Sequence, residues 1–141
     1  MLFRSTGNQT VVINGWNFGP LGSGVSLGYA PPSGGYGGVN GLLYTATGCV
    51  VVNHSVILCN TSEGVGANLQ WSVVIGNQSS GVSGASLTTS YRSPMITLVT
   101  ILYTDGSNST NSSALSSLPT AGGSLIAMTG WNMGQIGRAH V

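Results

Sequence analysis

Residues 10–19 read Thr-Val-Val-Ile-Asn-Gly-Trp-Asn-Phe-Gly, a short β-branched run that ends in a glycine-rich turn. Valine, isoleucine and threonine favour strands, whereas asparagine and glycine mark turns. The same alternation continues along the chain, and no segment sustains the 3.6-residue period of a helix. Strands are predicted at Thr10–Asn14, Val25–Tyr29, Leu42–Thr45, Cys49–Val52, Val56–Cys59, Leu69–Ile75, Ser86–Tyr91, Met95–Tyr103 and Ser124–Thr129. Turns at this density between short strands indicate an all-β protein built as an antiparallel sandwich.

The glycine-rich turn has a second copy 115 residues further along the chain. Gly15, Trp16, Asn17, Phe18 and Gly19 recur as Gly130, Trp131, Asn132, Met133 and Gly134. Four of the five residues are identical, which indicates an internal repeat. The sequence therefore predicts one sandwich over residues 1–93, a strand with a Ser/Thr-rich connector over 94–120, and the opening of a second repeat over 121–141. Because the second repeat is only begun, we expect the chain to be a piece of a longer tandem array, and residues 136–141 match the first copy poorly.

Further motifs follow the first turn in a fixed order. They are Ile57-Leu58-Cys59-Asn60-Thr61, the Gly-x-Gly at residues 64–66, the strand at 71–75, and Tyr91, Pro94 and Ile96 in a Tyr-x-x-Pro-x-Ile pattern. Together with residues 15–19 they resemble the IPT/TIG family of immunoglobulin-like sandwiches, which occur in plexins, some transcription factors and repetitive surface proteins. The likeness covers about residues 7–97, and the stretch 64–71 is similar to tandem-repeat IPT surface proteins of protists and algae. The resemblance implies an immunoglobulin-like sandwich.

The resemblance also implies an unpaired sheet edge. In this family a strand beginning Pro-x-Ile opens each repeat, and here only six residues precede Gly7, so we expect the first repeat to lack that strand. The matching strand, Pro94–Leu102, lies downstream. An open edge exposes unpaired backbone groups. Either residues 94–134 complete the sandwich of a neighbouring chain by strand addition, which propagates head-to-tail, or the chain belongs to a covalent tandem array.

The chain is almost free of charge, with three arginines, two acidic residues and no lysine among 141 residues. Three scattered arginines cannot neutralise a nucleic-acid backbone, so no nucleic-acid partner is expected. With 41% hydrophobic residues the chain is not of the disordered class. Its longest apolar run has nine residues, too few for a membrane span.

The two cysteines lie symmetrically about His54. If Asn53-His54-Ser55 forms a three-residue turn, Val52 faces Val56 and Cys49 faces Cys59. Directly opposed residues of an antiparallel pair have Cα atoms about 4.5–5.5 Å apart, within the range of a disulfide. The sequence therefore predicts a disulfide between Cys49 and Cys59.

Six Asn-x-Ser/Thr sequons are present, about twice the number that composition alone would produce. Their asparagines are Asn8, Asn53, Asn60, Asn77, Asn108 and Asn111. Each falls at a predicted strand end, turn or connector, where an oligosaccharide would reach solvent. The six are predicted N-glycosylation sites; the alternative is that Ser/Thr-rich loops create sequons by composition.

No catalytic, cofactor or metal site is predicted. His54 lies within a sequon and His140 in the poorly matching tail, and no hydrolase triad can be assembled around either. The glycine loop at residues 34–41 lacks nucleotide-binding spacing, and Asp105–Asn108 lacks the last acidic ligand of a calcium loop. The tryptophans Trp16, Trp71 and Trp131 could form a sugar platform, although packing is the commoner role. Tyr29, Tyr36 and Tyr44 beside the glycine loop are further candidates for a binding surface.

The sequence thus favours a non-enzymatic structural protein, secreted or at the cell surface. We expect an N-glycosylated IPT-like repeat whose copies assemble into a fibril or surface array, with itself and covalent glycans as its partners. The alternative is a cell-surface recognition ectodomain that binds a protein or glycan through its loops. The structural interpretation predicts exchange of strands between chains, whereas the recognition interpretation predicts a sugar-free patch with exposed aromatic residues.

Overall fold

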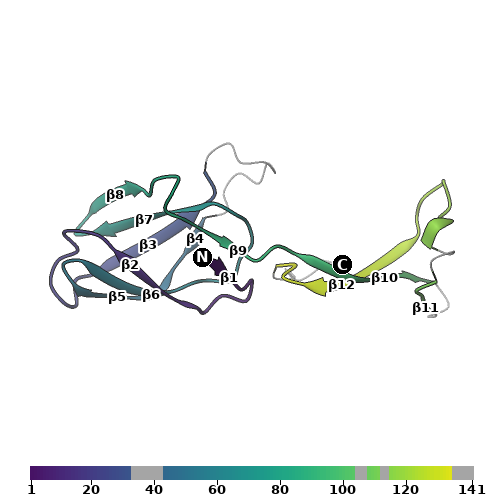
Figure 1. Cartoon of the computed structure of the whole chain (residues 1–141), viewed down its shortest axis with the longest axis horizontal. Coiled ribbons are helices and arrows are strands. Elements are labelled where there is room, and N and C mark those ends of the chain that lie inside the picture. Colours follow the sequence, from purple (N-terminus) through teal and green to yellow (C-terminus); the bar gives the residue numbers. More distant parts are fainter. Residues whose placement is uncertain (33–42, 104–107, 112–114, 135–141) are drawn as a thin grey trace. The chain divides into compact units, whose positions relative to one another are not determined.

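A computed structural model describes residues 1–32, 43–103, 108–111 and 115–134. The chain divides into two compact units, of which Met1–Ser93 form the body of the first and Pro94–Met133 form the second (Figure 1). The described protein is all-β, as the sequence predicts. The predicted strand Leu42–Thr45 begins outside the described residues.

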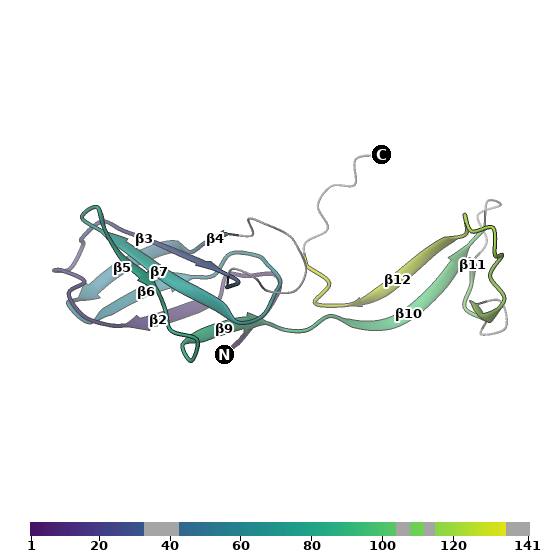
Figure 2. The ribbon, with the colours of Figure 1, turned by 90° about the horizontal axis from the view of Figure 1, so that it is seen from above.

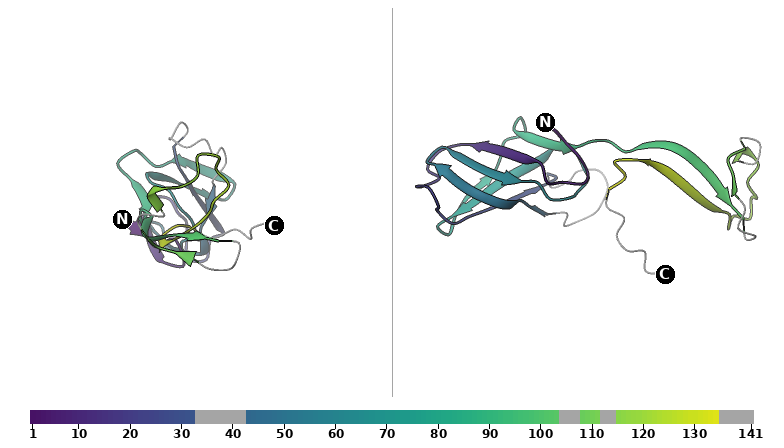
Figure 3. Two further views of the ribbon diagram at one scale, coloured as in Figure 1. Left: turned by 90° about the vertical axis from the view of Figure 1, so that its right-hand side faces the viewer. Right: turned by 90° about the horizontal axis from the view of Figure 1, so that it is seen from below.

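Two sheets make up the first unit, an arrangement compatible with a β-sandwich (Figures 2 and 3). One sheet has the order β1-β9-β7-β3-β4, with β8 also paired to β7, and the other has the order β2-β6-β5. All pairs are antiparallel except β1 with β9. The strands are β1 (Leu2–Phe3), β2 (Thr10–Asn14), β3 (Val25–Ala30), β4 (Tyr44–Thr45), β5 (Thr47–Asn53), β6 (Val56–Asn60), β7 (Leu69–Ile75), β8 (Gln78–Val82) and β9 (Thr88–Tyr91).

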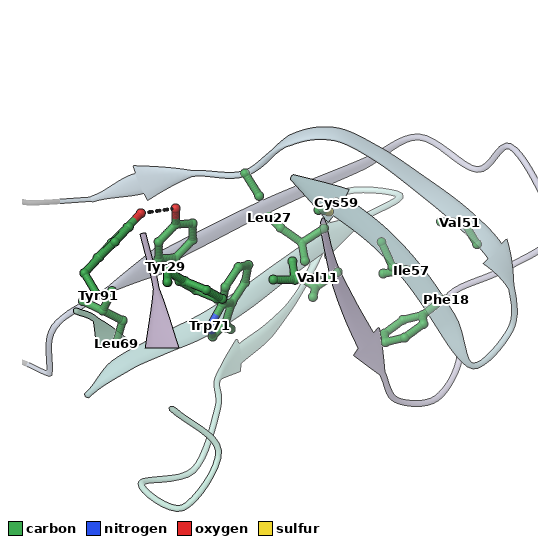
Figure 4. Close-up of a cluster of buried hydrophobic side chains, with 13 residues drawn as sticks. Val11, Phe18, Leu27, Tyr29, Val51, Ile57, Cys59, Leu69, Trp71 and Tyr91 are labelled. Atoms are coloured by element: carbon green, nitrogen blue, oxygen red, sulfur yellow. Dashed lines mark hydrogen bonds between the residues drawn. The ribbon is translucent and has the colours of Figure 1, made fainter. Parts of the chain in front are cut away.

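The core of the first unit is made from the inward faces of both sheets. On β7 the side chains alternate, with Leu69, Trp71 and Val73 buried, which is the two-residue period of a half-buried strand. Val11, Ile57 and Cys59 meet them from the other sheet, as Figure 4 shows in close-up. Tyr29 stacks on Trp71 with ring centroids 4.3 Å apart. Tyr29, one of the three tyrosines suggested for a binding surface, is therefore a core residue and is 1% exposed.

The chain changes sheets at Ala46. Tyr44 and Thr45 pair with β3, whereas the residues from Thr47 onward pair with β6. The Ala46 N–H donates to the Leu27 carbonyl at 3.0 Å, and the Ala46 side chain is buried. A small side chain at this crossing lets the two sheets approach each other.

A short strand that the sequence does not predict precedes Gly7, and it differs from the Pro-x-Ile strand that is expected to be missing there. Leu2 and Phe3 form β1 and pair in parallel with Ser90 and Tyr91 of β9. Phe3 is fully buried and packs edge-on against Trp71 and Tyr91. The first six residues thus complete the β9 side of one sheet and leave the other sheet without a strand beyond β2.

The second unit is a three-stranded antiparallel sheet in the order β11-β10-β12. Its strands are β10 (Met95–Leu102), β11 (Asn108–Ser109) and β12 (Leu125–Trp131). The sequence predicts β10 and β12, whereas β11 lies inside the stretch it assigns to a polar connector. Pairing runs from Met95 opposite Trp131 to Leu102 opposite Leu125, with one bulge between Ile96 and Leu98.

Candidate functional site

The Cys49–Cys59 disulfide is present and links β5 to β6. The Cα atoms are 4.2 Å apart, and Cys59 is 1% exposed. Val51 lies opposite Ile57, but the predicted pairing of Val52 with Val56 does not form. Asn53 lies opposite Val56 instead, because the turn has two residues rather than three and a bulge absorbs the difference.

Most of the sequon asparagines are exposed. Asn8, Asn53, Asn77, Asn108 and Asn111 have exposed side chains, and Asn60 is half-buried. Asn77 follows Gly76 at the tip of the β7–β8 hairpin, where both residues have positive φ (54° and 65°). Two consecutive left-handed residues define a type I′ turn, which glycine and asparagine adopt most readily.

The sequon at Asn60 is tied into the fold more than the others. The Thr10 hydroxyl donates to Asn60 Oδ1 at 3.0 Å, and Ser62 Oγ lies 3.0 Å from the Tyr29 hydroxyl. The Ser62 N–H also donates to that hydroxyl, and the Tyr91 hydroxyl donates to the Ser62 carbonyl. Sequence reasoning missed this buried hydroxyl network (Figure 4, Tyr29 and Tyr91), because no local pattern links residues 29, 62 and 91.

The first copy of the repeat signature, residues 15–19, clamps the β5–β6 turn. The Gly15 N–H donates to the Ser55 carbonyl and the Phe18 N–H donates to the His54 carbonyl, both at 3.0 Å. Phe18 folds back over Gly15, and its ring occupies the space that a Cβ at that position would need. Asn17 and Gly19 have positive φ, of 62° and 84°. Every residue of the signature except Trp16 thus has a local structural reason.

The second copy, residues 130–134, has the same backbone. Asn132 and Gly134 have φ of 56° and 85°, and Met133 covers Gly130. The likeness extends upstream, since the N–H of Gly7 donates to the Arg4 carbonyl and that of Gly122, 115 residues later, donates to the Pro119 carbonyl. We call residues 2–19 the first opening segment and residues 117–134 the second opening segment.

The two opening segments differ in what covers their apolar side chains. Val11 and Phe18 of the first are 3% and 8% exposed, whereas the equivalent Ile126 and Met133 of the second are 40% and 45% exposed. The buried Phe3 has its counterpart in Leu118, which is 39% exposed. Within the described residues the second opening segment therefore presents an uncovered apolar face.

Trp16 stands at one end of the first unit, between two hairpin turns. Asn14 pairs with Val56 and Val25 pairs with Ile75, so the loop from β2 to β3 lies at the same end as the β5–β6 and β7–β8 turns. This end is on the left in Figure 1. Trp16 is 84% exposed and Trp131 is 66% exposed, whereas Trp71 is buried. Among the described residues, core packing thus accounts for Trp71 but not for Trp16 or Trp131.

Two clefts adjoin Trp16. The first, of about 300 Å³, is lined by Trp16, Asn17 and Phe18 of the β2–β3 loop, by Val73 and Ile75 of β7, and by Gln78, Ser79 and Ser80 of β8. The second, of about 290 Å³, is lined by Asn14, Gly15, Trp16 and Ser55. Each cleft therefore contains residues of a sequon, 77–79 in the first and 53–55 in the second.

The remaining candidate residues do not come together in a site within the described part of the chain. His54 is exposed at its turn, and Tyr44 is half-buried with its hydroxyl bonded to the backbone of Val65. Tyr36, the glycine loop at 34–41, Asp105 and His140 lie outside the described residues. In the described part of the chain no three His, Cys, Asp or Glu side chains are grouped as metal ligands. The same part holds no helix long and apolar enough to cross a membrane.

Comparison with protein-family models, with curated protein sequences and with solved structures finds no match for this chain.

Proposed function

We propose that this chain is an extracellular structural protein, an N-glycosylated IPT/TIG-like repeat whose copies assemble head-to-tail into a glycan-coated fibre or surface array. The observation that carries the proposal is the second opening segment, which repeats the backbone of the first while its core-equivalent side chains stay exposed. Exposed apolar surface of this kind favours association. A donor face and an acceptor edge on different parts of one chain make contacts that propagate rather than close.

The acceptor is the free edge of β2. The Gln9 carbonyl accepts from the Thr61 N–H, and the Gly15 N–H donates to the Ser55 carbonyl, so the odd-numbered residues of β2 direct their backbone groups toward β6. Backbone groups alternate along a strand, and those of Thr10, Val12 and Asn14 therefore point to the other edge. Among the described residues no strand pairs with that edge.

The second opening segment indicates what fits there. Thr129 is the counterpart of Asn14, and its carbonyl accepts from the Thr97 hydroxyl of β10. Relative to β12, β10 thus lies on the side that is open on β2. Strand addition from residues 94–134 of another copy would put a strand beside β2 in the place that β10 takes beside β12, and would place the apolar face of β12 against protein.

Strand order supports the immunoglobulin-like part of the proposal. Immunoglobulin-type sandwiches place strands B, E and D in one sheet and strands C, F and G in the other. Taking β2 as B, the orders β2-β6-β5 and β9-β7-β3 correspond to B-E-D and G-F-C. The Pro-x-Ile strand of the IPT pattern would be the one that pairs with β2.

The disulfide, the sequons and the lack of charge support the extracellular part. Disulfides persist in oxidising compartments. Net charge ordinarily keeps protein surfaces hydrated and apart, and here it is +1. Oligosaccharides on exposed asparagines would supply the hydration instead, so the same chain without glycans should aggregate. Comparing the intact mass of secreted protein before and after deglycosylation tests this, and a bare polypeptide mass would contradict the proposal.

Assembly is tested by replacing Val12 with proline, which removes an N–H on the open edge. Proline is tolerated where the N–H of an edge strand faces solvent, so the fold is expected to persist while filaments and large species in light scattering disappear. Val12→Ala keeps the N–H and serves as the matched control. Ile126→Asp should likewise abolish assembly, whereas Thr129→Asp, on the opposite face of β12, should not. Monodisperse wild-type monomers at micromolar concentration would refute head-to-tail assembly.

The recognition ectodomain remains a second candidate because of the exposed Trp16 and its two clefts. A loop-end aromatic residue beside polar side chains is typical of binding surfaces. In the structural proposal the chain's own glycan fills a cleft beside Trp16, whereas in the recognition candidate the clefts are free for a partner.

A further inference from the structure

We propose that Trp16 is the stacking platform for the first sugars of an N-linked glycan on Asn77, and that the 300 Å³ cleft between Trp16 and β8 is the seat of that glycan. This inference rests on the glycosylation that forms part of the proposed function. It adds an occupied site, a ligand chemistry and a residue whose role the fold does not explain.

The high exposure of Trp16 supports a ligand at this position. An indole that is 84% exposed on a folded unit leaves a large apolar ring in water. Gly15, Asn17, Phe18 and Gly19 each have a backbone or packing reason to be what they are, and Trp16 has none within the described residues. A pyranose ring has one face of C–H groups, and tryptophan offers the flat, electron-rich surface on which such a face stacks.

The cleft has the composition of a sugar site. Its apolar lining comes from Trp16, Phe18, Val73 and Ile75, and its polar lining comes from Asn17, Gln78, Ser79 and Ser80. The Ser80 hydroxyl is already bonded to the Val73 N–H and the Gly81 carbonyl, so the amides are the groups available to a ligand. Within the described residues the side chains of Asn17 and Gln78 make no hydrogen bond, so both amides can bond to sugar hydroxyls or to an N-acetyl group. A few polar groups beside an apolar surface fix the orientation of such a ligand.

The sequon at Asn77 is the one that the cleft favours. Gln78 and Ser79, which follow Asn77 in its sequon, themselves line the cleft that contains Trp16. Asn77 is exposed at the tip of the type I′ turn, directly before these two residues, so a glycan attached there starts beside the cleft. The cleft toward Asn53 contains one residue of that sequon, Ser55, and lacks the Phe18 ring. We therefore assign the Asn77 glycan rather than the Asn53 glycan to Trp16.

The test uses the full-length chain secreted by a eukaryotic host, with occupancy at each sequon measured by glycopeptide mass spectrometry. Native protein is treated with an enzyme that releases N-glycans, and the rate of release is followed at each site. Stacking protects the bond, so Trp16→Ala should speed release at Asn77 by about three- to tenfold, which is the range that an aromatic contact supplies. Release at Asn8 and Asn108 should not change. Trp16→Phe should restore part of the protection.

Trp131→Ala is the matched control, because it removes the other exposed tryptophan of the signature motif, which is not among the residues that line the cleft. It should leave release at Asn77 unchanged. As a second readout, the N-acetyl methyl signal of the Asn77 glycan should be shifted upfield by the indole ring current in the wild type and not in Trp16→Ala.

The outcomes distinguish failure of the Trp16 platform from failure of the proposed function. Faster release at Asn77 in Trp16→Ala alone supports the platform. An occupied Asn77 whose release rate ignores Trp16, an empty Asn77 beside other occupied sequons, or a Trp16 effect at Asn53 instead overturns the platform but leaves the glycosylated fibre standing. If no sequon is occupied, the proposed function fails together with the inference.

Discussion

Removing the Cys49–Cys59 disulfide should destabilise the first unit by an amount that follows from its loop. The two residues are ten positions apart. In the chain-entropy model, closing a loop of about ten residues lowers the conformational entropy of the unfolded chain by about 9 cal/mol/K. This raises the free energy of the unfolded chain by about 2.7 kcal/mol at 25 °C. Domains of this size are stable by roughly 5–15 kcal/mol. The cross-link would therefore supply a large fraction of the stability.

Two forms of the chain separate the cross-link from the packing of the sulfur atoms. Reduction keeps both thiols and removes only the constraint, so the loss should be about 2.7 kcal/mol. The double replacement Cys49→Ala with Cys59→Ala also deletes the Cys59 sulfur, which lies in the core. That truncation should add about 1 kcal/mol. The alanine variant should therefore be less stable than the reduced protein.

Urea unfolding followed by tryptophan fluorescence measures both losses. Trp71 is the buried indole, so the change in emission on unfolding reports chiefly on the core of the first unit. With a urea dependence of about 1–3 kcal/mol per molar, the midpoint should fall by roughly 1–2.5 M on reduction. A fall worth less than about 1 kcal/mol would refute the entropic reasoning. It would mean that β5 and β6 stay paired in the unfolded chain without the cross-link.

Two further predictions concern the buried tyrosines. Tyr29→Phe deprives the Ser62 N–H and the Tyr91 hydroxyl of a partner and should cost about 1–3 kcal/mol in urea unfolding; Tyr44→Phe, whose hydroxyl bonds are exposed, should cost less, and equal losses would contradict the argument. Burial, and next the hydrogen bond to Tyr29, raises the pKa of Tyr91 above its ordinary value of 10.0. The fold therefore favours the neutral phenol, and this stability is present below about pH 10 and lost as the pH rises further. Urea midpoints measured from about pH 8 to about pH 11 should fall at the alkaline end. The fall should be smaller in Tyr91→Phe, and an equal fall in that variant would exclude Tyr91 as the cause.

The strands that could be predicted from the sequence are those with a strong local pattern. Thr10–Asn14 and Leu69–Ile75 have the predicted bounds because β-branched residues run between glycine and asparagine turns. β8, Gln-Ser-Ser-Gly-Val, was missed because all five of its residues are exposed and it has no apolar period. It is a strand because Ser72, Val74 and Ile75 of β7 hold it by backbone pairing after a tight turn. β1 was missed because two residues carry no period and its partner β9 lies more than 80 residues away.

The candidate site was predictable only in its parts. The sequons, the cysteine pair and the repeat signature are local patterns that can be read from neighbouring residues. The clefts beside Trp16 depend on three turns meeting at one end of the unit, and this meeting follows from the pairing of β2 with β6 and of β3 with β7. The role of Tyr29 was misjudged for the same reason. Along the chain it lies next to the last residue of β3, close to the loop that follows, whereas its neighbours in space are Trp71 and Tyr91.

The two opening segments allow a comparison inside one chain of what is kept and what is changed. The buried positions differ, since Val11 and Phe18 correspond to Ile126 and Met133. Apolar residues of similar volume substitute for one another in a core, so this variation is expected. The tryptophan of the signature, by contrast, is identical in both copies although it is exposed in both. Neither the backbone nor the core requires an indole at this position. A tryptophan in both copies therefore favours a role in binding at the surface for Trp16 and Trp131. A second prediction about glycans follows: in a longer array, the counterpart of Trp16 in every complete repeat should face a sequon-bearing hairpin.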